Sequence, residues 1–191
     1  MCNSIHSYLK VLAMALAVLM LLNTAPTMAA NKAEIDRDVR GALQTLYENN
    51  VMAKTLGKKA KGILVFPSIL KAGFIVGGQG GNGALLKNGK TVGYYNTAAA
   101  SYGLQAGIQN YGYAMFFMTD AALAYLYKSG GWEIGVGPSV VIVDKETAAA
   151  FGKSMTTSTL KDDIYAFIFS QKGLMAGIGL QGSKITRIHP K

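Results

Sequence analysis

Cysteine, histidine and proline are scarce in this chain of 191 residues, and each shortage excludes a class of protein. One cysteine and two histidines cannot supply a disulfide scaffold or a zinc module built from Cys and His ligands. Four prolines exclude a proline-rich linker protein. Neither disulfides nor a metal site are therefore expected in this protein.

Side chains with catalytic potential are also few. Without a cysteine or a well-placed histidine, a nucleophile would need a lysine or a carboxylate as its partner. His189 lies in the C-terminal tail, and Glu133 has no evident partner. Asp162 and Asp163 are adjacent acids before an apolar segment, a pattern typical of a solvated turn. We therefore expect no enzyme activity and no cofactor.

Hydrophobic residues and glycine, in contrast, are abundant. Half of the residues are hydrophobic, 15% are charged, and the chain has 23 glycines. This composition and length favour one packed domain over a disordered chain or two domains.

The first residues have the features of an export signal. Lys10 precedes an apolar run over residues 11–22, which is shorter than the roughly 20 residues that a helix needs to cross a bilayer. Small residues at Thr27 and Ala29 suit signal peptidase, so we predict a signal peptide over 1–29, with cleavage after Ala30 as an alternative. The mature domain would span 30–191 in the bacterial periplasm, on the cell surface or outside the cell. An uncleaved anchor is the other interpretation.

Residues 33–60 have the periodicity of one long amphipathic helix. Apolar residues recur near helical spacing, with acids at the start of the segment and lysines at its end, as the helix dipole favours. Gly57 and Gly62 are candidate stops. The apolar face either packs on the rest of the domain or detaches to lie in a membrane interface. The first alternative is the more common one.

Beyond residue 62 the pattern changes to short strands. Asn88-Gly89 predicts a hairpin turn, and Thr119-Asp120 predicts the start of a helix. Strands are predicted over 63–66, 74–76, 84–86, 92–95, 102–118, 132–143 (broken near Gly137-Pro138), 164–170, 174–180 and 185–188, and short helices over 121–128 and 145–155. The predicted fold is a single α+β domain. It has a mostly antiparallel, glycine-rich sheet or partial barrel, a long N-terminal amphipathic helix and short helices.

Two glycine motifs resemble nucleotide-binding loops, but their context argues against that function. Residues 78–83 match G-x-G-x-x-G, yet a strand and a turn follow instead of the helix that would hold a pyrophosphate. Gly89-Lys90-Thr91 lacks both the required first glycine and a following helix. We predict no nucleotide site.

The distribution of charge is the most informative feature of the sequence. Lysine and arginine number 19 against 10 acids, for a net charge of +9, which the loss of Lys10 would lower to +8. No acid occurs between Glu48 and Asp120, while seven lysines do: Lys54, Lys58, Lys59, Lys61, Lys71, Lys87 and Lys90. Such a segment attracts lipid head groups, nucleic acid or acidic proteins. The alternative interpretation is that these lysines only keep the domain soluble.

Lysine outnumbers arginine by 16 to 3, which favours a diffuse anionic surface as the partner. Specific recognition of bases and phosphates tends to use arginine, so we expect no specific nucleic acid partner. Each lysine near an anionic membrane contributes about 1 kcal/mol of attraction. The pattern therefore predicts peripheral binding to anionic lipid head groups, or else to an acidic protein. It leaves the oligomeric state open.

Several segments resemble the SYLF domain. They are AKGILVFPSILKAGFIVGGQGGNGALL (60–86), SYGLQAGIQ (101–109), the Gly137-Pro138 step and QKGLMAGIGLQGSKI (171–185). Their order and spacing agree with that family over about residues 33–188. The chain resembles the family's exported bacterial branch, the lipid-binding SYLF or Las seventeen-binding actin-regulator-like proteins.

The resemblance implies binding without catalysis. Eukaryotic members bind phosphoinositide-containing membranes through a basic surface and an amphipathic N-terminal segment, and yeast members also bind actin filaments. Lys61 and Lys71 match basic positions of the opening motif, and Lys172 matches one in the closing motif. The lipid-binding residues predicted from charge and resemblance together are Lys54, Lys58, Lys59, Lys61, Lys71, Lys87, Lys90 and Lys172. The sequence departs from the family at Ser139-Val140, where many relatives have an arginine, and at Ser170 and Gln181.

Overall fold

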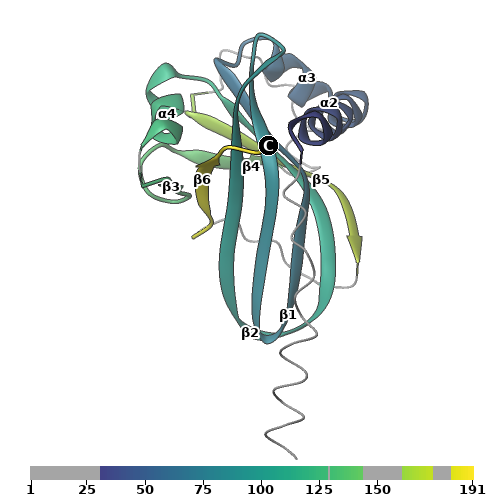
Figure 1. Cartoon of the computed structure of the whole chain (residues 1–191). Helices are drawn as coiled ribbons and strands as arrows, with labels where there is room; N and C mark the ends of the chain where they lie inside the picture. The colour runs from purple at the N-terminus through teal and green to yellow at the C-terminus, as the bar shows by residue number, and fades with distance from the viewer. Residues whose placement is uncertain (1–30, 129, 144–160, 174–181) are drawn as a thin grey trace, which may run out of the picture.

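The computed structural model describes residues 31–128, 130–143, 161–173 and 182–191. Ten elements follow one another in these ranges (Figure 1). They are α2 (Lys32–Asn49), α3 (Val51–Gly57), β1 (Gly62–Lys87), β2 (Lys90–Phe117), α4 (Asp120–Ala124), the 3-10 helix η1 (Tyr125–Tyr127), β3 (Trp132–Glu133), β4 (Val140–Val143), β5 (Ile164–Gly173) and β6 (Lys184–Ile188). Among these residues, no helix is both long enough and apolar enough to cross a bilayer.

A single long hairpin organises the sheet. β1 and β2 pair antiparallel from Gly62↔Phe117 to Lys87↔Lys90. Their turn has positive φ at Asn88 (51°) and Gly89 (74°), as a two-residue type I′ turn requires. The hairpin is bent across its middle, where the register shifts between Gly73 and Ile75, so that both strands run away from the turn and return (Figure 1).

Bending the hairpin gives the sheet its curled shape, a half-barrel. Gly83 makes the close approach of the two halves of β1 possible, because a Cβ there would overlap the carbonyl oxygen of Val65. The first half of β2 also pairs with β6, and its second half pairs with β5. The order is β3-β6-β2-β5-β4, with β1 paired to β2. Among the described strands, only the β4–β5 pair is parallel.

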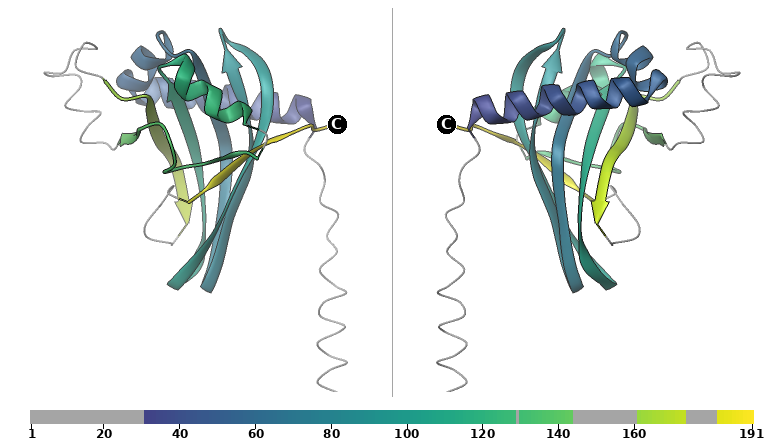
Figure 2. Two further views of the ribbon diagram at one scale, coloured as in Figure 1. Left: turned by 90° about the vertical axis from the view of Figure 1, so that its left-hand side faces the viewer. Right: turned by 90° about the vertical axis from the view of Figure 1, so that its right-hand side faces the viewer.

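Each face of the half-barrel has its own hydrophobic core. Successive strand residues point to opposite faces, so Leu64 and Phe66 belong to one core and Ile63 and Val65 to the other. The interior core continues into α4, η1 and Trp132, whereas the outer core continues into α2 and α3. Figure 2 shows α2 and α4 on opposite sides of the sheet.

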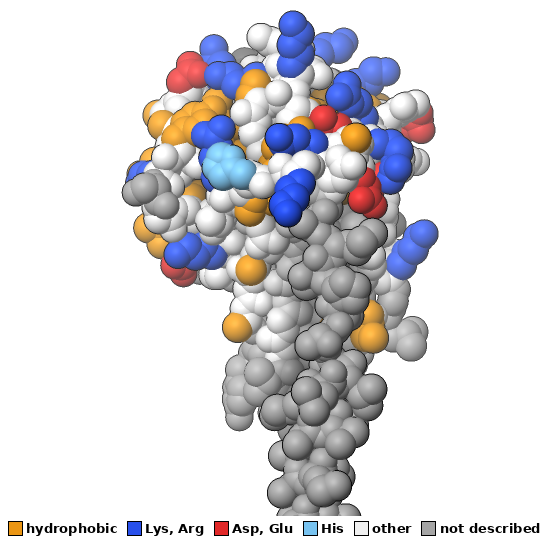
Figure 3. Space-filling model, in the orientation of Figure 1, with side chains coloured by type: hydrophobic (Ala, Val, Ile, Leu, Met, Phe, Trp, Pro, Cys, Tyr) orange, Lys and Arg blue, Asp and Glu red, His pale blue; other side chains and the backbone are white. Residues whose placement is uncertain are grey.

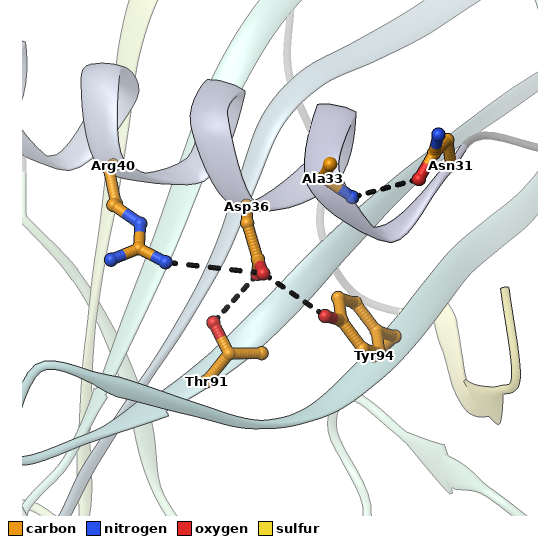
Figure 4. Close-up of polar contacts among 6 residues, drawn as sticks. All are labelled: Asn31, Ala33, Asp36, Arg40, Thr91 and Tyr94. Carbon is orange, nitrogen blue, oxygen red and sulfur yellow. Dashed lines mark hydrogen bonds and ion pairs between the residues drawn. The ribbon is translucent and has the colours of Figure 1, made fainter. Parts of the chain in front are cut away.

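A carboxylate on α2 fastens that helix to β2. Asp36 accepts hydrogen bonds from Thr91 Oγ1 (2.7 Å) and from the Tyr94 hydroxyl (3.2 Å), and Arg40 Nη2 lies 4.0 Å away (Figure 4). Burial and the neighbouring Asp36 charge raise the pKa of Tyr94, so its hydroxyl remains the donor. The apolar face of α2 therefore packs on the sheet. Of the two alternatives for the predicted helix, packing and detachment, this is the more common one.

The predicted single helix over 33–60 is wrong in one respect. Asn50 interrupts it with extended backbone (φ −144°, ψ 104°) and caps α3 by accepting a hydrogen bond from the Ala53 N–H at 2.9 Å. An asparagine side chain competes with the helical backbone in this way. The predicted stop at Gly57 is confirmed.

The predicted strands have the right type but the wrong lengths. The segments 63–66, 74–76 and 84–86 are all parts of β1, and 92–95 and 102–118 are parts of β2. Pro67 only shifts the register between Phe66 and Ile69 and does not end the strand. Segment 132–143 divides into β3 and β4, whereas 164–170 and 185–188 are confirmed as β5 and β6.

Two local signals are confirmed by the structure. Asn88-Gly89 forms the hairpin turn, and Thr119 caps α4 by accepting a hydrogen bond from the Ala122 N–H at 3.1 Å. The motif at 78–83 lies inside β1, so the strand predicted to follow it is confirmed. The predicted helix over 145–155 and strand over 174–180 lie outside the described residues.

Candidate functional site

Six of the eight predicted lysines lie at one end of the half-barrel. We call this group the lysine end, and it consists of Lys54 on α3, Lys58, Lys59 and Lys61 between α3 and β1, and Lys87 and Lys90 at the β1–β2 turn. Figure 1 shows α3 and the turn at the same end of the sheet. Lys and Arg side chains also gather there in the space-filling view (Figure 3).

Packing between the start and the end of β1 brings the lysines near α3 close to the lysines at the β1–β2 turn. Gly62 opens β1, and a Cβ on it would lie 3.1 Å from Leu85 Cδ1, close to the β1–β2 turn. Leu56 of α3 and Leu86 of β1 belong to the same outer core. The lysines that follow α3 and those at the turn are therefore neighbours in space although they are distant in sequence.

The lysine end keeps most of its positive charge. All six side chains are exposed except that of Lys87, which is half-buried. Among the described residues only Lys61 has an acidic partner, Asp120, with Nζ and Oδ2 4.0 Å apart. These two side chains are 53% and 77% exposed, so water and salt screen their attraction.

An exposed apolar residue lies beside these lysines. Val51, the first residue of α3, is 73% exposed and is the most exposed large hydrophobic residue in the described part of the chain. Lys54 follows it at the i+3 position of the helix and so shares its face, and Lys58 caps the end of the helix. This face of α3 therefore combines an apolar side chain with the cation of Lys54, and a second cation follows at the end of the helix.

The other two predicted lysines lie elsewhere. Lys172 is exposed on β5, opposite Asn110 of β2, away from the turn. Lys71 is only 6% exposed. It faces the interior of the half-barrel and lies opposite Gln109 of β2. The prediction that Lys71 belongs to the exposed basic surface is therefore wrong, because the period of the strand turns its side chain inward with Ile69.

The acids considered as catalytic candidates have structural roles. Asp163 accepts hydrogen bonds from Thr119 Oγ1 (3.1 Å) and the Ser139 N–H (3.3 Å) and so joins two loops. Asp162 accepts from the Tyr165 hydroxyl at 3.3 Å. The prediction of a solvated turn was therefore incomplete. The described residues contain no cluster of His, Cys, Asp and Glu that could hold a metal ion.

Sequence reasoning missed two features of the site region. Val51 is one of the apolar residues of the predicted helix over 33–60, and the break at Asn50 leaves it exposed instead of buried. The interior polar residues Gln79 and Gln109 were not considered at all. Their alternation with core residues along β1 and β2 could have indicated that they point inward.

Comparison with known proteins found a match to one family model. Residues 98–189 match the family model described as Ysc84, Las17-binding protein actin regulator. This match includes three of the four segments on which the resemblance was based. A search among curated proteins gave no match. The family is one of binding domains, associated with lipid and actin-related binding. This match supports a SYLF domain in the chain.

Proposed function

We propose that this protein binds anionic membranes peripherally and without catalysis, through the lysine end. The observation that carries the proposal is the grouping of Lys54, Lys58, Lys59, Lys61, Lys87 and Lys90 at one end, with Asp120 as the acidic partner of one of them. Lysines at an anionic surface each contribute about 1 kcal/mol of attraction, so several acting together give a useful affinity at moderate salt.

Val51 adds a shallow apolar contact to this attraction. Its side chain lies on the same helix face as Lys54, so a membrane that meets the lysines also meets the valine. This contact does not require α2 to leave the sheet, because Val51 lies on α3. The apolar face of α2 stays in the core. The proposal includes the predicted signal peptide at 1–29 and the export of residues 30–191. The partner is then a membrane leaflet that faces the periplasm or the outside of the cell.

A co-sedimentation assay with vesicles tests this function. Vesicles with phosphatidylglycerol should sediment the protein, vesicles of phosphatidylcholine alone should not, and added salt should release it. Equal binding to both kinds of vesicle would contradict the proposal.

Charge reversal at two positions tests the location of the site. Replacing Lys58 and Lys59 by glutamate should weaken vesicle binding by roughly 30-fold or more, since two attractions are lost and two repulsions gained. The matched control reverses Lys172 and Lys184, which are exposed elsewhere and change the net charge equally. An equal effect of both pairs would show that net charge, rather than the lysine end, controls binding.

The family description favours a second candidate, binding to an acidic protein surface such as an actin filament. The same lysines would supply the attraction. Pelleting of the purified protein with actin filaments, in parallel with the vesicle assay, separates the two functions.

A further inference from the structure

A β-bulge lies next to the β1–β2 turn, at the lysine end. Leu85 pairs with Gly93 and Leu86 pairs with Thr91, so Val92 of β2 is an extra residue without a partner on β1. Bulges of this kind re-aim a side chain at the rim of a sheet. Val92 is 45% exposed, so the bulge holds an apolar side chain at the protein surface.

The first turns of α2 place cations beside this valine. Asp36 accepts a hydrogen bond from Thr91 Oγ1 at 2.7 Å, so α2 lies next to the residue that precedes Val92. Lys32 and Arg40 lie one turn before and one turn after Asp36, and therefore on the same side of the helix. Both are exposed. Figure 4 shows the Arg40 and Asp36 side chains on the side of α2 that faces Thr91.

The segment after β6 brings a further cation to the same place. β6 runs antiparallel to the start of β2 as far as the pair Tyr94↔Ile188, so the residues that follow continue toward the turn. The Lys32 N–H donates a hydrogen bond to the Lys191 carbonyl oxygen at 3.2 Å. In both views of Figure 2 the last residue lies at the start of α2. Lys191 is exposed there, close to the turn that carries Lys90.

The nearby acids do not cancel this positive charge. Asp36 already accepts hydrogen bonds from two hydroxyl groups and lies 4.0 Å from Arg40. Glu34 and Asp38 lie two residues before and after Asp36, which turns them by about 200° to the opposite side of the helix. Three cations form no ion pair with any described residue: Lys32, Lys90 and Lys191.

We infer that Val92 and the cations around it make a second contact with the anionic membrane of the proposed function, on which this inference rests. We call this group the bulge patch, and it consists of Lys32, Arg40, Lys90, Val92 and Lys191. It is continuous with the lysine end, because Lys90 belongs to both. The cations meet the lipid head groups, and the valine side chain enters the boundary between head groups and acyl chains. Val51 and Val92 then touch one membrane from two elements and set the tilt of the half-barrel.

A membrane fits the bulge patch better than a second copy of the chain does. The chain has a net charge of +9, so the cations of two such patches would repel each other. Val92 also offers far less apolar area than a stable dimer buries. A shallow lipid contact, in contrast, needs only a few apolar side chains beside cations.

Quenching by spin-labelled lipid tests whether residue 92 enters the membrane. A fluorophore is attached at Val92→Cys or, as the control, at Leu70→Cys, and both chains also carry Cys2→Ser. Leu70 is similarly exposed (52%) on β1, away from the turn. Phosphatidylglycerol vesicles that contain a lipid with a nitroxide near the top of its acyl chain should quench the label at residue 92. The label at residue 70 should keep its emission.

The same samples separate this inference from the proposed function. A chain that sediments with the vesicles while the label at residue 92 stays unquenched overturns the bulge patch and leaves membrane binding in place. Equal quenching at residues 70 and 92 also overturns it. A chain that does not sediment overturns both proposals.

Removing two cations tests the charged part of the bulge patch. Lys32→Gln combined with Lys191→Gln should weaken vesicle binding by about tenfold or more, since two attractions are lost. A cation at the start of a helix is unfavourable for its dipole, so Lys32→Gln should not weaken α2. The matched control, Lys172→Gln with Lys184→Gln, removes the same charge from exposed positions elsewhere. Equal effects of the two pairs overturn the inference.

A substitution that keeps the shape of the side chain tests the apolar part. Val92→Thr retains a β-branched residue in the strand, so the fold should be unchanged. Vesicle binding should weaken by about threefold to tenfold, because a hydroxyl replaces a methyl group in the membrane boundary. Leu70→Thr should bind as the native chain does. Unchanged binding by Val92→Thr, or equal weakening by both variants, overturns the inference.

Discussion

At the scale of single residues, polar side chains decide how the helices are attached to the sheet. Asp36 holds the start of α2 on β2 through Thr91 and Tyr94. Asn50 ends one helix and caps the next. Each acts through one or two hydrogen bonds, so each can be tested by a single substitution.

Asp36→Ala should lower the free energy of unfolding by about 1–3 kcal/mol, because Thr91 and Tyr94 would lose a charged acceptor. Asp38→Ala is the control. Asp38 pairs only with the adjacent, exposed Arg37 among the described residues, so its loss should change stability by about 0.5 kcal/mol or less. Urea unfolding measures both values, and equal effects would contradict the anchoring role of Asp36.

Buried tyrosines make the fold sensitive to alkali. Burial raises the pKa of Tyr111 from 10 to about 12 and raises that of Tyr113 further in the same direction. Between pH 10 and about 12 the unfolded chain releases the Tyr111 proton and the folded chain keeps it, so stability falls as the pH rises. This difference corresponds to about 2–3 kcal/mol for Tyr111 alone, with no loss below pH 10.

Melting temperatures measured from pH 8 to pH 12 check this window. The native chain should lose stability only above about pH 10, and Tyr111→Phe should make that loss less steep. A loss of stability that begins near neutral pH would point to other groups.

At the scale of elements, the sequence predicted types better than lengths. Turn chemistry is local, so Asn88-Gly89 and Thr119 were recognisable without tertiary information. The continuity of β1 was not recognisable, because glycines and Pro67 interrupt its apolar pattern. The bend of the hairpin, which places Gly83 against Val65, explains why the strand needs glycine at this position.

Two glycine substitutions with opposite effects test that explanation. Gly83→Ala should lower stability by about 1–3 kcal/mol, since its Cβ would overlap the Val65 carbonyl oxygen and the two halves of β1 would have to separate. Gly41→Ala, on the exposed face of α2 with nothing within 4 Å, should raise stability by about 0.5–1 kcal/mol. Thermal unfolding measures both. Stabilisation by both substitutions would show that β1 is not packed this closely.

At the scale of the whole molecule, the fold converts a run of lysines into a localised charge. The absence of acids between Glu48 and Asp120 was visible in the sequence, and so were the lysines. Their grouping at one end was not visible in the sequence, because it depends on the bend that brings the end of β1 back beside its start. The period of the strand turns Lys71 inward with Ile69, which no count of charges could reveal.

The most direct test of the central claim is to determine which end of the half-barrel touches a membrane. An environment-sensitive fluorophore is attached at Asn88→Cys, between Lys87 and Lys90, or at Ala100→Cys, an exposed residue of β2 toward the bend. Both chains also carry Cys2→Ser. Phosphatidylglycerol vesicles should shift the emission of the label at residue 88 to shorter wavelength and leave that at residue 100 unchanged. A shift at residue 100 without one at residue 88 would contradict the assignment of membrane binding to the lysine end.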